Sequence, residues 1–295
     1  MGAPGLGRVY TALIAVQAIF GVHYIAAKVL LAEVPPPAWA VFRLGSATLL
    51  FAGVYLARGG GAIPWREHGR LAVLALFGVV VNQICFVEGL SRTTPAHSSL
   101  INTTIPVATL LFAVLMGREP LRRSSAAGIF LALAGVLVLV RVDDLELRAE
   151  WFVGDLLTLV NACSFAFFLV ISRPVIRRLG SMRATAYLLA WGTLGVAAYG
   201  GADAAALPAS VWTPKLLALG AYIVVFPTVI AYFLNYWALG RVESSIVALF
   251  VYLQPILGGG LSVWFLDEPF MWWLVVSSIF VFVGVLFTTR RTRNT

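Results

Sequence analysis

Charged and sulfur-containing side chains are scarce in this sequence. Asp, Glu, Lys and Arg make up only 12% of its 295 residues, whereas soluble domains carry roughly 25%. A chain with so little charge cannot cover a globule with polar surface, which excludes a soluble globular protein. The two cysteines, Cys85 and Cys163, both lie in apolar runs, so we expect neither a disulfide framework nor a zinc site.

Apolar residues dominate instead. Hydrophobic residues make up 60% of the chain and the mean hydropathy is +0.92, which predicts an integral membrane protein. The formal net charge of +8 would suit a nucleic-acid partner, but the basic residues stand in short clusters between apolar runs. The positive-inside rule explains such clusters, so we expect the lipid bilayer, and no nucleic acid, as a partner.

Ten segments are long and apolar enough to span a bilayer, which takes about 20 residues. They are residues 9–30, 36–57, 70–90, 95–117, 121–141, 151–172, 182–203, 214–239, 243–266 and 270–289. The first follows Arg8 and nine similar runs come after it, so we interpret it as a retained helix rather than a signal peptide. The connections are short. The predicted fold is an all-α integral membrane protein with ten transmembrane helices.

Basic residues are distributed unevenly between the two ends of these spans. If the N-terminus is cytoplasmic, 15 of the 21 basic residues lie at inner ends and five at outer ends, while Arg43 lies within a span. Cytoplasmic connections carry an excess of Lys and Arg. We therefore expect a multi-pass protein of the cell inner membrane with both termini in the cytoplasm.

The sequence repeats itself at an offset of 149 positions. Residues 89–141 align without a gap to residues 238–290, and 11 of the 53 pairs are identical. Leucines and valines match by chance, so the informative pairs are Arg92/Arg241, Pro106/Pro255, Glu119/Glu268, Pro120/Pro269 and Arg141/Arg290. We interpret this as an internal duplication, with one five-helix repeat in residues 1–148 and a second in residues 149–295.

An odd number of spans in each repeat would place the two repeats in opposite orientations in the membrane. Inverted repeats of this kind are typical of secondary transporters, whose substrate site lies near the bilayer midplane between the halves. Tilting one half against the other exposes such a site to each side in turn. The duplication therefore favours transport by alternating access.

Proline stands near the middle of spans four and nine. Pro106 and Pro255 each remove one backbone hydrogen bond and crowd the carbonyl four residues earlier. Ordinary kinks are one interpretation, since proline is frequent in membrane helices. We favour a pair of symmetric bends that expose polar backbone to a central cavity, because the placement is symmetric. Pro227 in span eight has no counterpart at Gly78 and is interpreted as an ordinary kink.

Polar side chains recur at helical spacing inside several spans. In span one, Gln17, Gly21, Tyr24 and Lys28 follow one another at steps of four, three and four, so they share one face. Taken singly, such residues often only hydrogen-bond between helices. As a group they predict the lining of one cavity, and the substrate-binding candidates are Gln17, His23, Tyr24, Asn82, Gln83, Ser98, Asn102, Tyr232, Asn235, Tyr252 and Gln254.

Four charged residues, Lys28, Arg43, Glu88 and Asp155, lie inside apolar spans, where a charge costs about 2.5–3.5 kcal/mol on insertion scales. A pairing among Arg43, Glu88 and Lys28 would lower that cost and form an outer gate or a zwitterion site. The structural alternatives are that Lys28 snorkels to the interface and that Asp155 caps its helix. Glu88 and His23 are the candidates for proton coupling. The gating or coupling candidates are Lys28, Arg43, Glu88, Pro106 and Pro255.

The pairs Glu119-Pro120 and Glu268-Pro269 precede spans five and ten. Proline is favoured at the first helical position and a carboxylate at the positive end of the helix dipole. We therefore predict that each pair starts its own helix, as architecture first and as a gating element second.

Signatures of enzymes and cofactors are missing from the sequence. It has no HExxH, no GxSxG and no Walker-type glycine loop, and His23, His68 and His97 are not at metal-ligand spacing. We therefore expect no enzymatic activity, no cofactor and no metal.

Several short motifs stand in a fixed order along the chain. They are Gly21 with Lys28 in span one, Phe42-Arg43-Leu44 in span two, Gly89-Leu90 at the end of span three, Pro106 with Glu119 in span four, and Pro255 with Glu268 in span nine. In this order and spacing the chain resembles the EamA-type transporters of the drug/metabolite transporter superfamily over residues 8–290. The resemblance implies ten helices in two inverted five-helix repeats. It also implies movement of small metabolites, often amino acids or related compounds and frequently outward, through a central cavity.

The sequence therefore predicts a secondary transporter that exports amino acids or similar small polar metabolites by alternating access. Sugar- or lipid-linked substrates are the alternative within transport, and a channel or a membrane-embedded enzyme is the alternative from another class. Spans one, three, four, eight and nine are expected to contribute most of the cavity.

Overall fold

The structure is a computed structural model, and it describes residues 5–140, 151–254, 256 and 272–290. All regular elements in these ranges are helices. They are α1 (Leu6–Leu31), α2 (Pro36–Ala57), α3 (Trp65–Ala75), η1 (Leu76–Val81), α4 (Asn82–Arg92), α5 (Pro95–Asn102), α6 (Ile105–Leu115), α7 (Arg123–Val140), α8 (Phe152–Leu179), α9 (Ser181–Ala206), η4 (Ala209–Val211), α10 (Pro214–Ile223), η5 (Val224–Ile230), α11 (Ala231–Leu239), α12 (Ser244–Leu249), η6 (Phe250–Tyr252) and α14 (Trp272–Arg290).

Six helical stretches among the described residues are long and apolar enough to cross a membrane. They are Leu6–Leu31, Pro36–Ala57, Trp65–Arg92, His97–Leu115, Phe152–Leu179 and Pro214–Leu239. The other four predicted spans contain α7, α9, α12 and α14. Every segment predicted to span the membrane therefore contains helix.

The helices begin and end where the sequence supplies suitable residues. Proline stands in the first turn of α2, α5, α6 and α10, where its missing N–H leaves no bond unmade. Thr94 and Thr213 cap α5 and α10 by accepting backbone N–H groups of His97 and Leu216. Gly180 separates α8 from α9 with a φ of 83°, a conformation that glycine adopts without strain.

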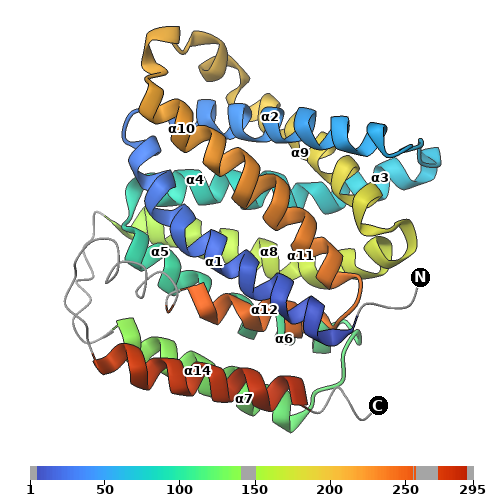
Figure 1. Cartoon of the computed structure of the whole chain (residues 1–295), viewed down its shortest axis with the longest axis vertical. Coiled ribbons are helices and arrows are strands. Elements are labelled where there is room, and N and C mark those ends of the chain that lie inside the picture. Colours follow the sequence, from blue (N-terminus) through green and yellow to red (C-terminus); the bar gives the residue numbers. More distant parts are fainter. Residues whose placement is uncertain (1–4, 141–150, 255, 257–271, 291–295) are drawn as a thin grey trace.

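The connections alternate between two ends of the bundle (Figure 1). In that view α1 begins and α14 ends on the right-hand side, where α2 also meets α3 and α8 meets α9. We call this side the terminal end and the left-hand side the opposite end. Such alternation is typical of a helical protein whose chain crosses a membrane several times.

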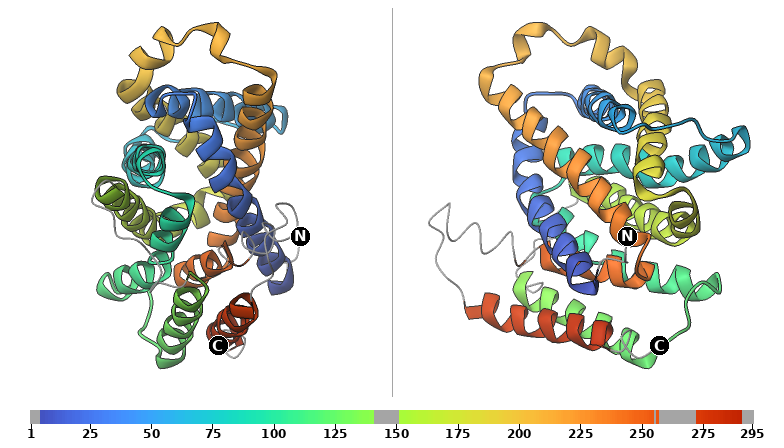
Figure 2. Two further views of the ribbon diagram at one scale, coloured as in Figure 1. Left: turned by 90° about the vertical axis from the view of Figure 1, so that its left-hand side faces the viewer. Right: turned by 45° about the vertical axis from the view of Figure 1, so that its right-hand side comes forward.

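Helices from the two halves of the chain pack against each other. α2 contacts α9, α4 contacts α8, α1 contacts α11 and α7 contacts α14. The α7–α14 pair forms one edge of the molecule (Figure 2). A Cβ on Gly284 of α14 would lie 2.5 Å from the carbonyl oxygen of Gly128 on α7, so the glycine is what allows these helices to approach so closely.

Elements in the two halves begin at matching positions. Trp65 and Pro214 start α3 and α10, Pro95 and Ser244 start α5 and α12, and the members of each pair are 149 positions apart. π-helical segments, η1 and η5, occupy the middles of spans three and eight. These elements therefore follow the same offset as the sequence repeat, whereas α8 and α9 do not begin 149 positions after α1 and α2.

Span four is interrupted rather than bent. α5 ends at Asn102, α6 begins at Ile105, and Pro106 stands in the first turn of α6. The backbone N–H groups of Thr103 and Thr104 donate to carbonyls three residues earlier at 2.9 and 3.0 Å. Their hydroxyls donate to the same carbonyls at 2.6 and 2.7 Å. The predicted mid-helix bend is thus wrong in form at Pro106. Pro255 lies outside the described residues.

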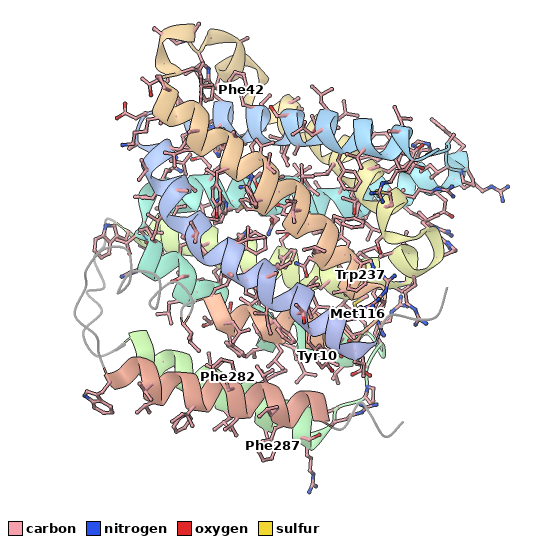
Figure 3. All side chains as sticks on the ribbon, viewed as in Figure 1. Tyr10, Phe42, Met116, Trp237, Phe282 and Phe287 are labelled. Carbon is pink, nitrogen blue, oxygen red and sulfur yellow. The ribbon has the colours of Figure 1, made fainter. Side chains whose placement is uncertain are left out.

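Apolar side chains cover the outside of the bundle. Leu49, Leu115 and Trp65 are 76%, 72% and 83% exposed, and Phe287 points away from the helices (Figure 3). So much exposed apolar surface would be unusual in water, whereas in a bilayer it contacts lipid. Buried polar side chains gather inside the bundle instead, and they define the candidate site.

Candidate functional site

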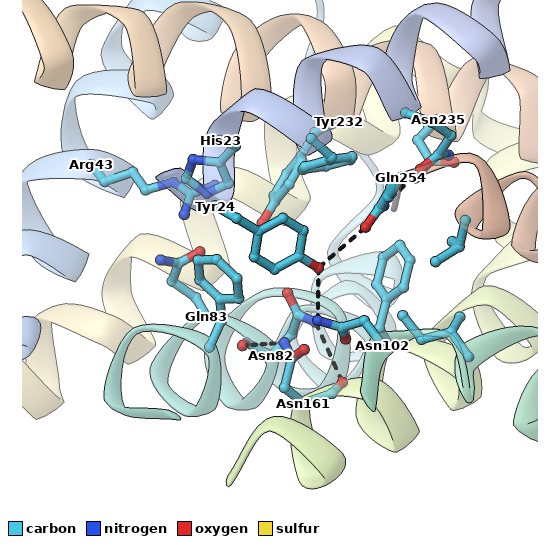
Figure 4. Close-up of a pocket in the computed structure, with 16 residues that line it drawn as sticks. His23, Tyr24, Arg43, Asn82, Gln83, Asn102, Asn161, Tyr232, Asn235 and Gln254 are labelled. Carbon is cyan, nitrogen blue, oxygen red and sulfur yellow. Dashed lines mark hydrogen bonds between the residues drawn. The ribbon is translucent and has the colours of Figure 1, made fainter. Parts of the chain in front are cut away.

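A pocket lies inside the bundle between the two halves of the chain (Figure 4). The pocket has a cavity volume of about 80 Å³, which is room for several water molecules. The first half contributes Gln17, Phe20, His23, Tyr24, Arg43, Asn82, Gln83, Phe86, Asn102 and Ile105. The second half contributes Asn161, Phe165, Tyr232, Asn235, Val251 and Gln254.

Most of the predicted substrate-binding residues meet in this pocket. Those that line it are Gln17, His23, Tyr24, Asn82, Gln83, Asn102, Tyr232, Asn235 and Gln254, and Arg43 from the gating set joins them. Ser98 and Tyr252 are buried but do not line it. Beyond the expected spans, α2 contributes Arg43 and α8 contributes Asn161 and Phe165.

A chain of hydrogen bonds crosses the pocket from one half to the other. Asn102 Nδ2 donates to the Tyr24 hydroxyl at 2.8 Å, and that hydroxyl donates to Gln254 Oε1 at 3.1 Å. Gln254 Nε2 then donates to Gln17 Oε1 at 2.7 Å. The face predicted for Gln17 and Tyr24 on α1 is therefore the face that meets span nine.

The π-helical segment of span three is held by side chains of α8. Asn161 Nδ2 donates to the Asn82 carbonyl at 2.7 Å, and the Ser164 hydroxyl donates to the Phe77 carbonyl at 2.8 Å. These carbonyls lie at and just beyond η1, where the α-helical bonding pattern is broken. Asn161 is thus both a pocket residue and a support for the opposite wall.

Arg43 reaches the pocket from α2, and Thr228 holds it there. Its Nε donates to Thr228 Oγ1 at 2.8 Å, and the Thr228 hydroxyl donates to the Ile223 carbonyl at 2.7 Å. Pro227 has no N–H to give to that carbonyl four residues back, and the π-helical pattern of η5 moves the backbone bond on by one residue, to Thr228. Pro227, interpreted from the sequence as an ordinary kink, therefore helps to position a pocket residue.

Several buried polar atoms around the pocket have no hydrogen-bond partner among the described residues. They are both ring nitrogens of His23, Gln83 Nε2, Asn102 Oδ1 and Asn235 Oδ1. Buried polar groups are nearly always paired in folded proteins. Unpaired groups that converge on one cavity are therefore available to water or to a ligand.

The expected pairing among Arg43, Glu88 and Lys28 is wrong. Lys28 Nζ donates to three backbone carbonyls at and beyond the end of α4, at 2.7–3.2 Å, which is a helix-capping role. Glu88 pairs with Arg92 one turn later and accepts from the Tyr199 hydroxyl of α9. Each of the three side chains has hydrogen-bond partners of its own, and the three do not pair with one another.

Glu119 acts on a different helix from the one predicted. Its Oε1 accepts the backbone N–H groups of Ser244 and Ser245 at 2.7 and 3.4 Å, and its Oε2 accepts the Ser245 hydroxyl at 2.5 Å. It therefore caps α12 in the second half, at the terminal end, instead of starting α7. Glu268 and Pro269 lie outside the described residues.

Asp155 joins the two halves at the opposite end. It lies in the first turn of α8, as expected for a capping residue, but its carboxylate also accepts from Thr93 Oγ1 at 2.5 Å and lies 3.1 Å from His97 Nδ1. His97 packs edge-on against Trp151. Each end of the bundle therefore has a buried or partly buried carboxylate that bridges the halves, in addition to the contacts of Glu67 with Arg178 and of Glu88 with Tyr199.

Sequence reasoning missed six lining residues: Phe20, Phe86, Ile105, Asn161, Phe165 and Val251. Five are apolar and resemble every other apolar residue of a span, so no signal marks them. Asn161 is an isolated amide in an apolar run, and the rule that found Asn102 would have found it too.

A second hollow opens at the terminal end, between α2, α9 and α11. Its lining includes Arg58, Arg183 and Arg241, and Arg241 stacks on the Trp237 ring at 4.2 Å. Arginine and tryptophan at a helix end are typical of the membrane interface. The interior pocket is therefore the candidate substrate site.

The fold and the pocket define a multi-pass helical membrane protein with a polar site between its two halves. The family model described as the EamA-like transporter family matches residues 8–141 and again residues 152–290. The chain belongs to the EamA-like transporter family, and it is a membrane transporter.

Relatives of similar length support this assignment. An uncharacterized transporter of Archaeoglobus fulgidus is 29% identical over 275 residues, 92% of this chain and 94% of the relative. The uncharacterized inner membrane transporter YedA of Escherichia coli K12 is 27% identical over 286 residues, 95% of this chain and 90% of the relative. A chain of known crystal structure shares the fold with a TM-score of 0.75 over 96% of both chains at 22% identity.

Proposed function

We propose that this protein is a secondary transporter that exports small polar metabolites, amino acids or related compounds, across the cell inner membrane by alternating access. The observation that carries the proposal is the interior pocket, whose amides and tyrosines come from both halves of the chain. Membership of a transporter family supports the activity. The unpaired amide groups support a small polar substrate over an apolar one.

The two halves are proposed to be inverted five-helix repeats, residues 1–148 and 149–295. Three observations support a duplication: the sequence offset, helix starts at the same offset, and a family model that matches twice. Five spans in each repeat would reverse the second relative to the first. The basic residues near the terminal end support a cytoplasmic location for both termini under the positive-inside rule.

Alternating access would require the two bridged ends to open in turn. Under this proposal, Glu119 with α12 closes the cytoplasmic end, and Asp155 with Thr93 and His97 closes the outer end. Pro106, at the break in span four, gives one flex point, and Pro255 is the matching candidate in span nine. Proton coupling through Glu88 or His23 belongs to the same proposal.

Reconstitution tests the proposal directly. The purified protein is reconstituted into liposomes that are loaded with unlabelled amino acids. Uptake of each labelled amino acid is then measured with and without a pH gradient. Protein-free liposomes and a Lys215→Gln variant, which removes an exposed cation away from the pocket, are the controls. We expect saturable exchange of at least one amino acid.

The same preparation distinguishes the alternatives. Exchange confined to sugar- or lipid-linked compounds would replace the proposed substrate class while keeping the carrier. Single-channel conductance in planar bilayers, at rates far above carrier turnover, would contradict alternating access. Chemical conversion of the solute during uptake would indicate an enzyme.

A further inference from the structure

Arg43 is the only residue with a permanent charge among those that line the pocket in the described part of the chain. It is 2% exposed, and no Asp or Glu is among the described residues that line the pocket. A buried charge without a counter-ion is destabilising, and in membrane proteins such a charge commonly marks a substrate or ion site. The pocket is therefore built to receive something negatively charged.

The guanidinium is held in a way that leaves one edge free. Its one hydrogen bond to the described residues is from Nε to Thr228 Oγ1, and its carbon lies 6.0 Å from the Phe86 ring centroid. Arginine carries five N–H donors, so the four donors on Nη1 and Nη2 have no partner in the described part of the protein. Those two nitrogens form the planar fork that binds a carboxylate through both oxygens.

Everything else that the pocket offers is neutral. The unpaired groups are the amides of Gln83, Asn102 and Asn235 and the imidazole of His23, and the remaining walls include Phe20, Phe86 and Phe165. Amide oxygens accept hydrogen bonds from hydroxyl and ammonium groups alike. No lining carboxylate stabilises a positive charge on the ligand.

We infer that the substrate is a small monocarboxylate whose carboxylate binds Nη1 and Nη2 of Arg43, and that its ammonium group, where it has one, is not required for recognition. This inference rests on the proposed function of the pocket as the substrate site. One Arg43 neutralises one carboxylate, whereas a phosphate dianion would leave a buried negative charge uncompensated. Amino acids and 2-hydroxy acids of the same side chain therefore bind alike, and the corresponding amines do not.

Matched sets of compounds test the inference on the full-length protein in liposomes. The probes are L-alanine, L-lactate and ethylamine; L-phenylalanine, L-phenyllactate and phenethylamine; and glucose as a neutral solute. In at least one set we expect the amino acid and the hydroxy acid to compete for exchange within about threefold of each other. The amine should be weaker by about 30-fold or more, as for the loss of a charged hydrogen-bonded pair.

Variants of Arg43 and Thr228 test whether the substrate carboxylate binds to Arg43. Arg43→Gln should raise KM for the carboxylates about 30-fold, Arg43→Lys should recover part of that loss, and Lys215→Gln should leave KM unchanged. Thermal unfolding of each purified variant checks that it is folded. If Arg43→Gln does not fold, Thr228→Val keeps the charge but removes its anchor, and it should raise KM several-fold with little change in kcat, while Thr228→Ser restores KM.

The outcomes separate this inference from the proposed function. Equal exchange of the amine and the amino acid with none of the hydroxy acid, or an unchanged KM in Arg43→Gln and Thr228→Val, would overturn the inference while leaving transport in place. Exchange of glucose alone would also overturn the inference while leaving transport in place. If the wild-type protein exchanged none of the probes, the proposed substrate class and the inference would both be wrong.

Discussion

The central pocket and the cluster around Glu119 both bury polar side chains between the two halves, but they satisfy them differently. Glu119 is 6% exposed and accepts three hydrogen bonds from α12. In the pocket, Asn102 and Asn235 are similarly buried, yet each has an amide oxygen without a partner among the described residues. Paired groups stabilise the contact between the halves, whereas the unpaired groups of the pocket are available to a ligand.

This difference between paired and unpaired groups predicts which substitutions change thermal stability and which change substrate exchange. Removing a group that satisfies buried donors leaves those donors unpaired, at about 1–3 kcal/mol each. Removing a group that has no protein partner costs the fold little. Substitutions around Glu119 should therefore change thermal stability, whereas substitutions in the pocket should change substrate exchange.

The largest effect on stability is expected at Glu119. Glu119→Ala leaves the backbone N–H groups of Ser244 and Ser245 and the Ser245 hydroxyl without their acceptor, so unfolding should be easier by about 2–4 kcal/mol. Hydrogen exchange at residues 244–249 should rise. Thermal unfolding and hydrogen-exchange mass spectrometry in detergent measure both.

Glu119→Gln is the matched variant, because it keeps one acceptor oxygen and should lose about half as much. An unchanged unfolding midpoint in Glu119→Ala would show that the carboxylate does not stabilise α12. The proposed contrast between a stabilising cluster at Glu119 and a ligand-binding pocket would then be wrong.

The opposite result is expected at Asn235 in the pocket. Asn235→Leu keeps the number and branching of the side-chain heavy atoms and removes an amide oxygen that has no hydrogen-bond partner among the described residues. Exchange should fall about tenfold, equivalent to about 1.4 kcal/mol of substrate binding, with no loss of thermal stability. Counterflow rates and the unfolding midpoint are measured on the same preparation.

Ser172→Ala is the control for that change. Ser172 is fully buried and its hydroxyl has no partner among the described residues, but it lies on α8 outside the pocket lining. The rate of substrate exchange by Ser172→Ala should equal that of the wild-type protein. Equal losses in both variants would mean that burial, rather than the pocket, explains the effect.

The sequence predicted this contrast only in part. Amides and tyrosines inside apolar spans have few explanations, so the positions of Gln17, Tyr24 and Asn102 in the sequence are sufficient to assign them to one cavity. Ser98 lies one helical turn before Asn102, yet it does not line the pocket. Both residues lie on α5, so sharing a helix face does not by itself place a side chain beside the pocket.

Contacts between the halves could not be predicted at all. Arg43 and Thr228 are 185 positions apart, and Glu119 and Ser244 are 125 positions apart. The sequence marks Arg43 as a charge that needs a partner and proposes Glu88 and Lys28, and it assigns Glu119 to the start of its own helix. The packing of α2 on η5 and of α6 on α12 supplies more distant partners for both.

A smaller change is expected at the opposite end of the bundle. Asp155→Asn removes the charge beside His97 but keeps an oxygen that can accept from Thr93, so stability should fall by about 1 kcal/mol, as for a partly exposed ion pair. Hydrogen exchange should rise at the start of α5 and not at α12. A rise at α12 instead would mean that the two bridges are not independent, against the proposal that the ends open in turn.

The smallest effect on the fold is expected at Glu88, which separates coupling from structure. Glu88 forms a surface pair with Arg92 one turn away and accepts from Tyr199, so Glu88→Gln should change stability by less than about 0.5 kcal/mol. If Glu88 carries the coupled proton, the variant loses uptake driven by a pH gradient but keeps exchange between two substrate pools. Both rates are measured in one liposome preparation, with Arg92→Gln as the variant that breaks the same pair from its other side. Gradient-driven uptake equal to wild type in Glu88→Gln would remove Glu88 from the coupling mechanism and leave His23, inside the pocket, as the candidate.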